Sequence, residues 1–164
     1  MTPLAFPKPI KEVKVPKYLR RKAKVRPLKK EKVKSLPKIK NLEARLKKVM
    51  YPYIKKRDGN TCISCGKKNL VGMDWHAGHY IKAELCNLVT RYDEWNINSQ
   101  CSHCNKWLRG NTIAYRNAMI WKYGEKAVAT LDREYHSPLP MDFSPRKWLL
   151  GMIEKYKHET KSRG

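Results

Sequence analysis

The stretch that decides the fold runs from residue 62 to residue 105 and reads CISCGKKNLVGMDWHAGHYIKAELCNLVTRYDEWNINSQCSHCN. It opens with the pair Cys62 and Cys65 and closes with the pair Cys101 and Cys104, followed at once by Asn105. Two Cys-x-x-Cys pairs at this separation are typical of one tetrahedral zinc ion held by four thiolates, with each pair forming a tight knuckle. The sequence therefore predicts a structural zinc site that clamps the loops between the two pairs.

Within this clamp, His79 is the residue best suited to proton transfer. A hydrolytic reaction needs an activated water and relief of charge in the transition state, and a single divalent cation can supply the second. A neutral imidazole can supply the first, because its pKa lies near physiological pH. The other interpretation of His79 is a core or zinc-adjacent histidine. For a histidine taken by itself, this second interpretation is the more common one.

The composition indicates a nucleic-acid partner. The chain has 164 residues and a formal net charge of +23, which calls for a polyanion; a ribosome-like structural protein or a solvated basic surface is the alternative. With no run of 18 apolar residues and no signal-peptide pattern, we expect no membrane span and a cytoplasmic location. Five cysteines are an odd count that indicates metal in a reducing compartment, with Cys86 left over as a buried or bystander thiol.

Residues 1–40 are expected to form a flexible basic arm that lies along phosphates. They hold 15 Lys or Arg, two acids and six prolines, so they cannot bury enough apolar surface to offset the entropy of ordering. The alternative is an unstructured solubilising tail. Residues 41–160 would then form the folded domain.

Helical periodicity predicts four helices around the clamp. The first is capped by Asn41 and runs to about Arg57, a second leads from Asn111 or Thr112 through Trp121 to Gly124, and a third spans 125–135. The last begins at Ser144-Pro145, and the aromatic residues of these helices are interpreted as core rather than as platforms for stacking bases. Residues 72–81 are expected to hold two short strands or a hairpin, 82–95 a loop, and Asn105 to open a short helix.

Several motifs resemble a known family. These are CISCG (62–66), AGHY (77–80), RYDEWNI (91–97), QCSHCNKWLRGN (100–111) and YRNAMIWKYG (115–124). Together they are similar to the phage NinG family, also called Rap recombinases, and more distantly to HNH (ββα-metal) nucleases with four cysteines such as endonuclease VII. The implied fold is mainly α with a small ββα-metal (HNH-like) zinc-clamped unit. The implied function is a metal-dependent DNA endonuclease on branched intermediates such as Holliday junctions and D-loops, with a dimer expected by analogy.

The resemblance also assigns residues. It makes His79, Asn96 and Asn105 the catalytic set, with Asn105 a ligand of the catalytic Mg²⁺ or Mn²⁺ and Asn96 orienting the base. The carboxylate that endonuclease VII-type enzymes carry directly before the histidine is replaced here by Gly78. The NinG pattern has an aspartate three residues before the histidine, where this chain has His76. His76, with Asp74 as the fallback, is therefore the expected second ligand.

Basic residues near the motifs are the expected DNA contacts. They are Lys55, Lys56, Arg57, Arg91, Lys106 and Arg109. The zinc spacing and the charge equally fit a non-catalytic four-cysteine zinc module that binds DNA or RNA. The set of His79, Asn96 and Asn105 favours the enzyme, whereas Gly78 and His76 favour the binding module.

Overall fold

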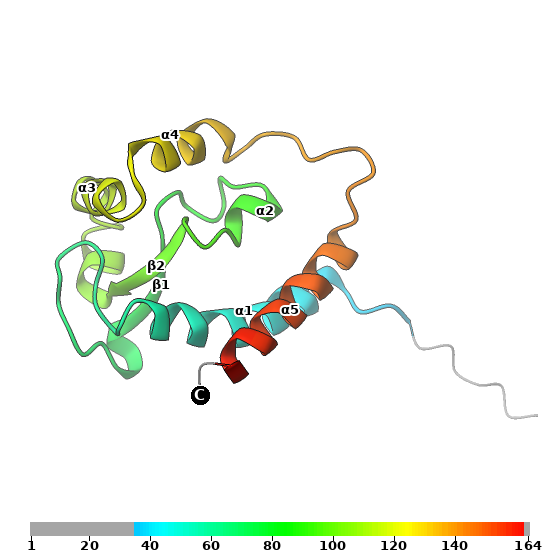
Figure 1. The fold of residues 1–164 in the computed structure, drawn as a ribbon, viewed down its shortest axis with the longest axis horizontal. Coiled ribbons are helices and arrows are strands. Elements are labelled where there is room, and N and C mark those ends of the chain that lie inside the picture. The colour runs from blue at the N-terminus through cyan, green and yellow to red at the C-terminus, as the bar shows by residue number, and fades with distance from the viewer. Residues whose placement is uncertain (1–34, 163–164) are drawn as a thin grey trace, which may run out of the picture. The chain divides into compact units, whose positions relative to one another are not determined.

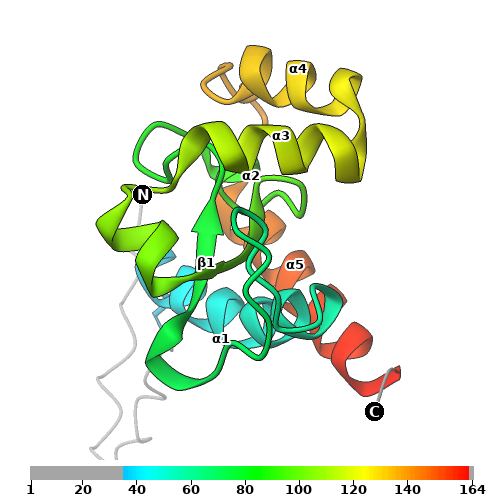
Figure 2. The same ribbon diagram turned by 90° about the vertical axis from the view of Figure 1, so that its left-hand side faces the viewer.

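The computed structural model describes residues 35–162, and the predicted arm lies almost wholly outside them. Within this range the chain is mainly helical with one two-stranded sheet. Its elements are α1 (Ile39–Arg57), η2 (Gly72–Asp74), β1 (Trp75–His79), α2 (Leu88–Arg91), β2 (Ile97–Cys101), η3 (His103–Trp107), α3 (Thr112–Tyr123), α4 (Glu125–Glu134) and α5 (Pro145–Ser162). Helices α1 and α5 lie on one side of the sheet, and α3 and α4 lie on the other (Figures 1 and 2). No helix of the described range is long and apolar enough to cross a membrane.

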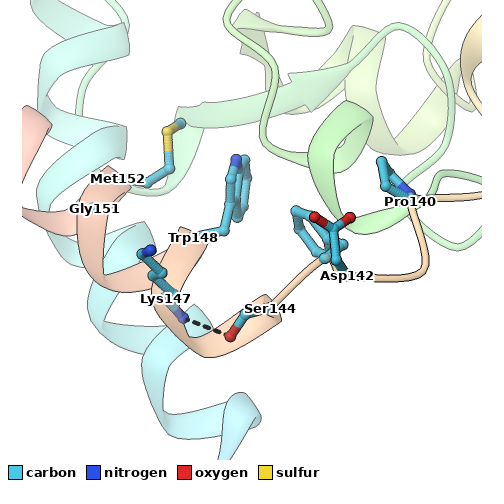
Figure 3. Close-up of a pocket in the computed structure, with 8 residues that line it drawn as sticks. Pro140, Asp142, Ser144, Lys147, Trp148, Gly151 and Met152 are labelled. Carbon is cyan, nitrogen blue, oxygen red and sulfur yellow. Dashed lines mark hydrogen bonds between the residues drawn. The ribbon is translucent and has the colours of Figure 1, made fainter.

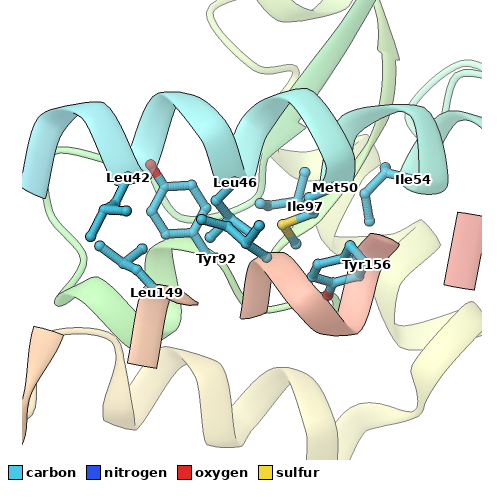
Figure 4. Packing of buried hydrophobic residues seen from close by; sticks show 9 residues of the cluster. Leu42, Leu46, Met50, Ile54, Tyr92, Ile97, Leu149 and Tyr156 are labelled. Carbon is cyan, nitrogen blue, oxygen red and sulfur yellow. The ribbon is translucent and has the colours of Figure 1, made fainter. Parts of the chain in front are cut away.

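The larger core joins α1 to α5. Helix α1 buries one residue per turn on a single face, and the buried residues of α5 pack against that face, as the periodicity predicts. Tyr92 and Ile97 pack into the same cluster from the segment around β2 (Figure 4), so the two helices also cover one face of the sheet. The buried members are Leu42, Leu46, Met50, Ile54, Tyr92, Ile97, Leu149, Ile153 and Tyr156.

The start of α1 differs from the prediction. The helix begins at Ile39 with Lys38 as its N-cap, and no side chain caps it. Asn41 lies inside the first turn, so the prediction that it caps the helix is wrong. The reason is packing: Ile39 lies against the core cluster, so the helix begins ahead of Asn41, and the carbonyl of Lys38 accepts from Leu42 N at 3.2 Å.

The sheet pairs two segments far apart in the sequence. Strand β1 is antiparallel to β2, with Trp75 opposite Cys101 and His79 opposite Ile97. The prediction of two strands within residues 72–81 is therefore wrong, because the second strand is Ile97–Cys101. The intervening loop contains the short helix α2, capped by Asn87 Oδ1, which accepts from the backbone N–H of Thr90 at 2.9 Å. The predicted order of strand, strand and short helix is nevertheless observed.

The second core packs α3 and α4 together. Tyr115 and Met119 of α3 contact Val128 and Leu131 of α4. Helix α3 ends at Gly124, which has φ of 88° and turns the chain directly into α4, as predicted. Trp121 was expected to be core, but it is 89% exposed, because α3 turns this side away from both the sheet and α4.

Candidate metal centre and the neighbouring pocket

The four predicted zinc cysteines come together. The sulfurs of Cys62, Cys65, Cys101 and Cys104 all lie within 4.8 Å of one another, and three of the four residues are buried. Cys65 Sγ lies 3.8 Å from Cys101 Sγ. A tetrahedral ion with metal–sulfur bonds of about 2.3 Å separates its ligands by about 3.8 Å, so this spacing fits. The cluster can bind a metal ion such as zinc.

The surrounding backbone holds the two knuckles in place. In the first knuckle, the carbonyl of Cys62 accepts from Gly66 N at 2.8 Å, and Gly66 has the positive φ that this turn requires. In the second, Cys101 Sγ accepts from the backbone N–H of Cys104 at 3.4 Å, and Asn111 Nδ2 donates to Cys104 Sγ at 3.5 Å. Donors aimed at the sulfurs stabilise thiolates, which is the form that binds metal.

Asp74 is part of this framework. Its carboxylate accepts from Ser102 Oγ at 2.6 Å and from Ser102 N at 3.2 Å, and it forms an ion pair with Lys67 at 2.9 Å. Lys67 and Ser102 together lower the pKa of Asp74 to about 2. Asp74 precedes β1, at the end of the strand away from His79. Its carboxylate therefore braces the second knuckle, and its place at the far end of the strand does not bring it beside His79 as a catalytic-metal ligand.

His79 and Asn105 line one pocket. The pocket has a volume of about 340 Å³ and lies beside β1, between η3 and the loop that follows the strand. Arg109 lines it as well, together with Glu84, which the sequence reasoning had not singled out. The full lining is Ala77, His79, Lys82, Ala83, Glu84, Asn105, Arg109 and Gly110. Three residues of the predicted site are thus brought together from β1 and the 105–110 segment.

The geometry of His79 defines its tautomer. Its Nε2 lies 3.1 Å from the carbonyl oxygen of Arg91. Because a carbonyl only accepts, the neutral tautomer that makes this bond carries its hydrogen on Nε2 and its lone pair on Nδ1. Burial lowers the pKa of His79, and the backbone carbonyls of Arg91 and Ala77 oppose this by favouring the charged form. The neutral imidazole, which is the form that accepts a proton, is therefore favoured.

Asn96 is buried and fully bonded. Its Oδ1 accepts from Ile81 N at 2.8 Å, and its Nδ2 donates to the carbonyl of Thr90 at 3.0 Å. The backbone adds a bond from Tyr80 N to the carbonyl of Asn96 at 2.8 Å. These bonds tie the residues after His79 to those just before Arg91, the residue whose carbonyl holds the imidazole. Asn96 thus holds together the two segments that flank His79 and Arg91, and its expected role in orienting the base stays a prediction.

Gly78 is required by its neighbour across the sheet. A Cβ at residue 78 would lie 2.4 Å from Gln100 Oε1 and 2.8 Å from Gln100 Cβ. Gln100 is completely buried, and its Nε2 donates to Ser64 Oγ at 2.7 Å and to the carbonyl of Gly110 at 2.6 Å. The side chain of Gln100 thus fills the space that a side chain at residue 78 would need. The sequence alone did not indicate this contact, because it depends on the register of the two strands.

His76 does not line the pocket. It lies directly opposite Gln100 in the sheet, and side chains alternate along a strand, so His76 points to the other face from Ala77 and His79. His76 Nε2 and Gln100 Oε1 are both buried without a hydrogen-bond partner among the described residues. Asn105 lies in the middle of η3, which begins at His103 rather than at Asn105 as predicted.

Two of the predicted DNA contacts are structural instead. Arg57 was expected to face solvent or DNA, which is wrong: it pairs with Asp58 at 2.8 Å and donates to the carbonyls of Glu94 and Ile97 at 2.7 and 2.8 Å. Arg91 donates to the carbonyls of Ala83 and Cys86 and forms an ion pair with Glu43 at 3.2 Å. Both guanidinium groups are used to satisfy backbone carbonyls of the loops around the pocket.

The remaining predicted contacts are more accessible. Lys106 and Arg109 are exposed on the segment that carries Asn105, and Lys56 is exposed on α1. Lys55 is half-buried, with its ammonium 5.7 Å from the centre of the Trp75 ring. Of the predicted cations, Arg109 lines the pocket of His79, and Lys106 is exposed on the same segment.

A second pocket lies away from these residues. It has a volume of about 490 Å³ and is formed by the segment 140–144 and the first turns of α5, with Trp148 and Met152 on its wall (Figure 3). Its lining includes no predicted site residue. One wall of this pocket is the start of α5, which begins at Pro145 as the sequence predicts. There Ser144 Oγ accepts a hydrogen bond from Lys147 N at 3.4 Å.

Comparison with known proteins gives the family. The chain is 36% identical over 85 residues to the protein ninG of Escherichia phage 933W, 35% over 85 residues to that of Escherichia phage lambda, and 37% over 84 residues to that of Salmonella phage P22. Each match covers 51% of this chain and 40–41% of the relative, so the chain spans about two fifths of the curated relatives it matches. No solved structure matches. The family described as Bacteriophage Lambda NinG protein matches residues 9–162, and the chain therefore belongs to the NinG family.

Proposed function

We propose that this protein is a metal-dependent DNA endonuclease of the HNH (ββα-metal) type that cuts branched DNA such as Holliday junctions and D-loops. One observation carries the proposal. A histidine whose tautomer is fixed by a backbone carbonyl lines the same pocket as Asn105 and Arg109. A pure binding module has no need of a neutral histidine held in this way. The order of strand, strand and short helix, in which β2 and η3 carry the second cysteine pair, also supports it.

The residues of the pocket divide the reaction between them. His79 Nδ1 takes the proton from a water that attacks the phosphorus, and the bond to the leaving 3′ oxygen breaks. Arg109 pairs with a non-bridging oxygen of the same phosphate and offsets its charge. Asn96 positions His79 through the loop bonds described above.

The catalytic cation is taken to be Mg²⁺ or Mn²⁺, which would stabilise the pentacoordinate phosphorus and the leaving oxygen. Hard cations favour oxygen ligands, and two oxygen-bearing side chains line the pocket, Asn105 and Glu84. We propose that these two hold the ion, and that Glu84 supplies the carboxylate that Gly78 cannot. His76 lies on the other face of β1 and is left out of this set. Zinc at the four cysteines has a structural role.

Preference for branched DNA comes from the family resemblance and the cationic surface. Symmetric cutting of a four-way junction needs two active sites, so two copies of the chain are expected to act together. The expected place of action is the cytoplasm of the bacterial host.

The test is nicking of an end-labelled four-way junction beside a linear duplex, with Mg²⁺ or Mn²⁺ titrated from zero. His79→Ala should lower the cleavage rate by about 10²- to 10⁴-fold while junction binding and zinc content stay unchanged. Asn105→Ala and Glu84→Ala should each shift the metal dependence to higher concentration. His158→Ala changes an exposed histidine of α5 and should cut at the wild-type rate.

Two results would overturn the proposal. Wild-type cleavage by His79→Ala would remove this histidine from the chemistry. If the wild-type protein binds the junction but neither Mg²⁺ nor Mn²⁺ supports cleavage at any concentration, the protein is the non-catalytic zinc module instead.

A further inference from the structure

An exposed tryptophan adjoins the pocket. Trp107 is 79% exposed, and Leu108 beside it is 47% exposed. An indole is a large apolar group that proteins normally bury or use at an interface. Trp107 lies two residues after Asn105 and two before Arg109, and both of these residues line the pocket of His79. The aromatic side chain and the proposed catalytic residues therefore share one short segment.

This segment is held firmly, so the exposure of Trp107 does not come from a loose loop. Arg109, Gly110 and Asn111 have φ of 48°, 101° and 45°, three successive residues in the left-handed region. Hydrogen bonds fasten the turn: Gly110 N donates to the carbonyl of Cys104 at 2.9 Å, and Asn111 N donates to that of Leu108 at 2.8 Å. Such a conformation persists only where its surroundings hold it, and it is common at functional sites.

The surroundings of Trp107 are cationic. Residues 102–124 contain Lys106, Arg109, Arg116 and Lys122 and no Asp or Glu. Arg116 pairs with Asp132 and Lys122 with Asp58. Lys106 and Arg109, which flank Trp107, have no acidic partner within residues 35–162. A second copy of this surface would bring like charges together. Nucleic acid, in contrast, has phosphates that can pair with the cations and bases that can stack on the indole.

We propose that Trp107 stacks on a base whose face is left free at the branch point of DNA, while Lys106 and Arg109 hold the adjoining phosphates. Stacking on aromatic side chains is how proteins bind bases that are out of a duplex, and it tolerates any sequence. In a linear duplex both faces of a base are covered by its neighbours. The flat face of a base is free only where stacking is broken, at a branch, gap or single strand. The inference rests on the proposed function and extends it, because it gives a physical reason for preferring branched substrates.

The experiment measures binding without cleavage, in zinc-containing buffer with no Mg²⁺ or Mn²⁺. Fluorescence anisotropy compares three probes of equal length: a linear duplex, a four-way junction and a duplex with a short single-stranded gap. Trp107→Ala should weaken binding to the junction and the gapped DNA by about 10- to 100-fold and leave the linear duplex within about twofold. Trp107→Phe keeps an aromatic face and should recover most of the loss. Trp121→Ala removes an equally exposed tryptophan, 89% accessible on α3, and should change none of the three.

A second readout reports the stacking itself. A 2-aminopurine placed in the gap should lose fluorescence when the wild type or Trp107→Phe binds, and keep it with Trp107→Ala. Equal losses on all three probes would make Trp107 a general contact and refute the inference, as would unchanged binding of Trp107→Ala or an equal effect of Trp121→Ala. These outcomes do not depend on whether the protein cuts, so an enzyme whose branch preference survives Trp107→Ala would refute the stacking and leave the proposed function standing.

Discussion

Replacing Gly78 by alanine tests whether Gln100 occupies the place of a residue-78 side chain. The new Cβ would lie 2.4 Å from Gln100 Oε1 and 2.8 Å from Gln100 Cβ, well inside van der Waals contact. The amide can rotate away only by giving up the hydrogen bonds from Nε2 to Ser64 and Gly110. The contact with Cβ can be relieved only by moving the strands apart, and the bond from Tyr115 OH to the carbonyl of Gly78, 2.9 Å long, opposes this.

The expected loss of stability is the sum of the steric overlap with Gln100 and the hydrogen bonds that Gln100 gives up. Overpacking of a well-packed site costs about 1–3 kcal/mol, and each buried hydrogen bond that is lost adds about 0.5–1.5 kcal/mol. We expect Gly78→Ala to lower the free energy of unfolding by about 3 kcal/mol, which for a domain of this size is a fall in Tm of roughly 10 °C. In a Gln100→Ala background the amide contact is gone and only the Cβ contact remains. There the same change should cost about 1 kcal/mol, a coupling of about 2 kcal/mol.

Urea and thermal unfolding of the four proteins of this cycle, with zinc in excess, give the measurement. Gly151→Ala is the matched control, because this glycine lies in α5 with nothing within 4 Å of a new Cβ and an ordinary helical conformation. It should stabilise the protein by about 0.5–1 kcal/mol. If Gly78→Ala unfolds within 0.5 kcal/mol of wild type, or if the cycle is additive, Gln100 does not fill this place.

Three further predictions concern other parts of the chain. Cys104→Ala should lose bound zinc and the cooperative unfolding transition, whereas Cys86→Ala, a buried cysteine outside the cluster, should keep both; atomic absorption and calorimetry check this, and a Cys104→Ala protein with a full zinc equivalent would contradict it. Arg57→Ala should destabilise the fold by about 3 kcal/mol because it leaves the carbonyls of Glu94 and Ile97 without their donor and takes one of two cations from Asp58, which keeps Lys122. Lys106→Ala should leave Tm unchanged and weaken DNA binding; equal melting of the two variants would show that Arg57 is not structural. Deleting residues 1–34, which stops short of the hydrogen bond from Arg146 Nε to the carbonyl of Pro37, should flatten the plot of log K against log salt for every DNA shape, and an unchanged slope would mean that the arm makes no phosphate contacts.

Local sequence determined the features that depend on near neighbours. The spacing within each Cys-x-x-Cys pair determines the turn of the knuckle. Two such pairs supply the four sulfurs of one tetrahedral metal site, so the clustering of the four cysteines could be predicted. The buried faces of α1 and α5 follow from their repeat of about 3.6 residues, and the helix boundaries at Gly124 and Ser144-Pro145 follow from backbone preferences. The family motifs likewise named the histidine and the asparagine that the pocket joins.

Only the tertiary structure decided which distant groups meet. Strand β1 pairs with residues 97–101 rather than with its own neighbours, and the four-cysteine cluster and the Asn96 bonds join the same segments. Arg57 looked like any other surface cation, yet carbonyls 37 and 40 residues away give it a buried position. The same register places Gln100 against Gly78 and takes His76 out of the pocket. The burial of a side chain and its hydrogen-bond or ion-pair partners depend on residues that are close in space. The identity of a charged or aromatic residue in the sequence does not show whether the fold will bury it.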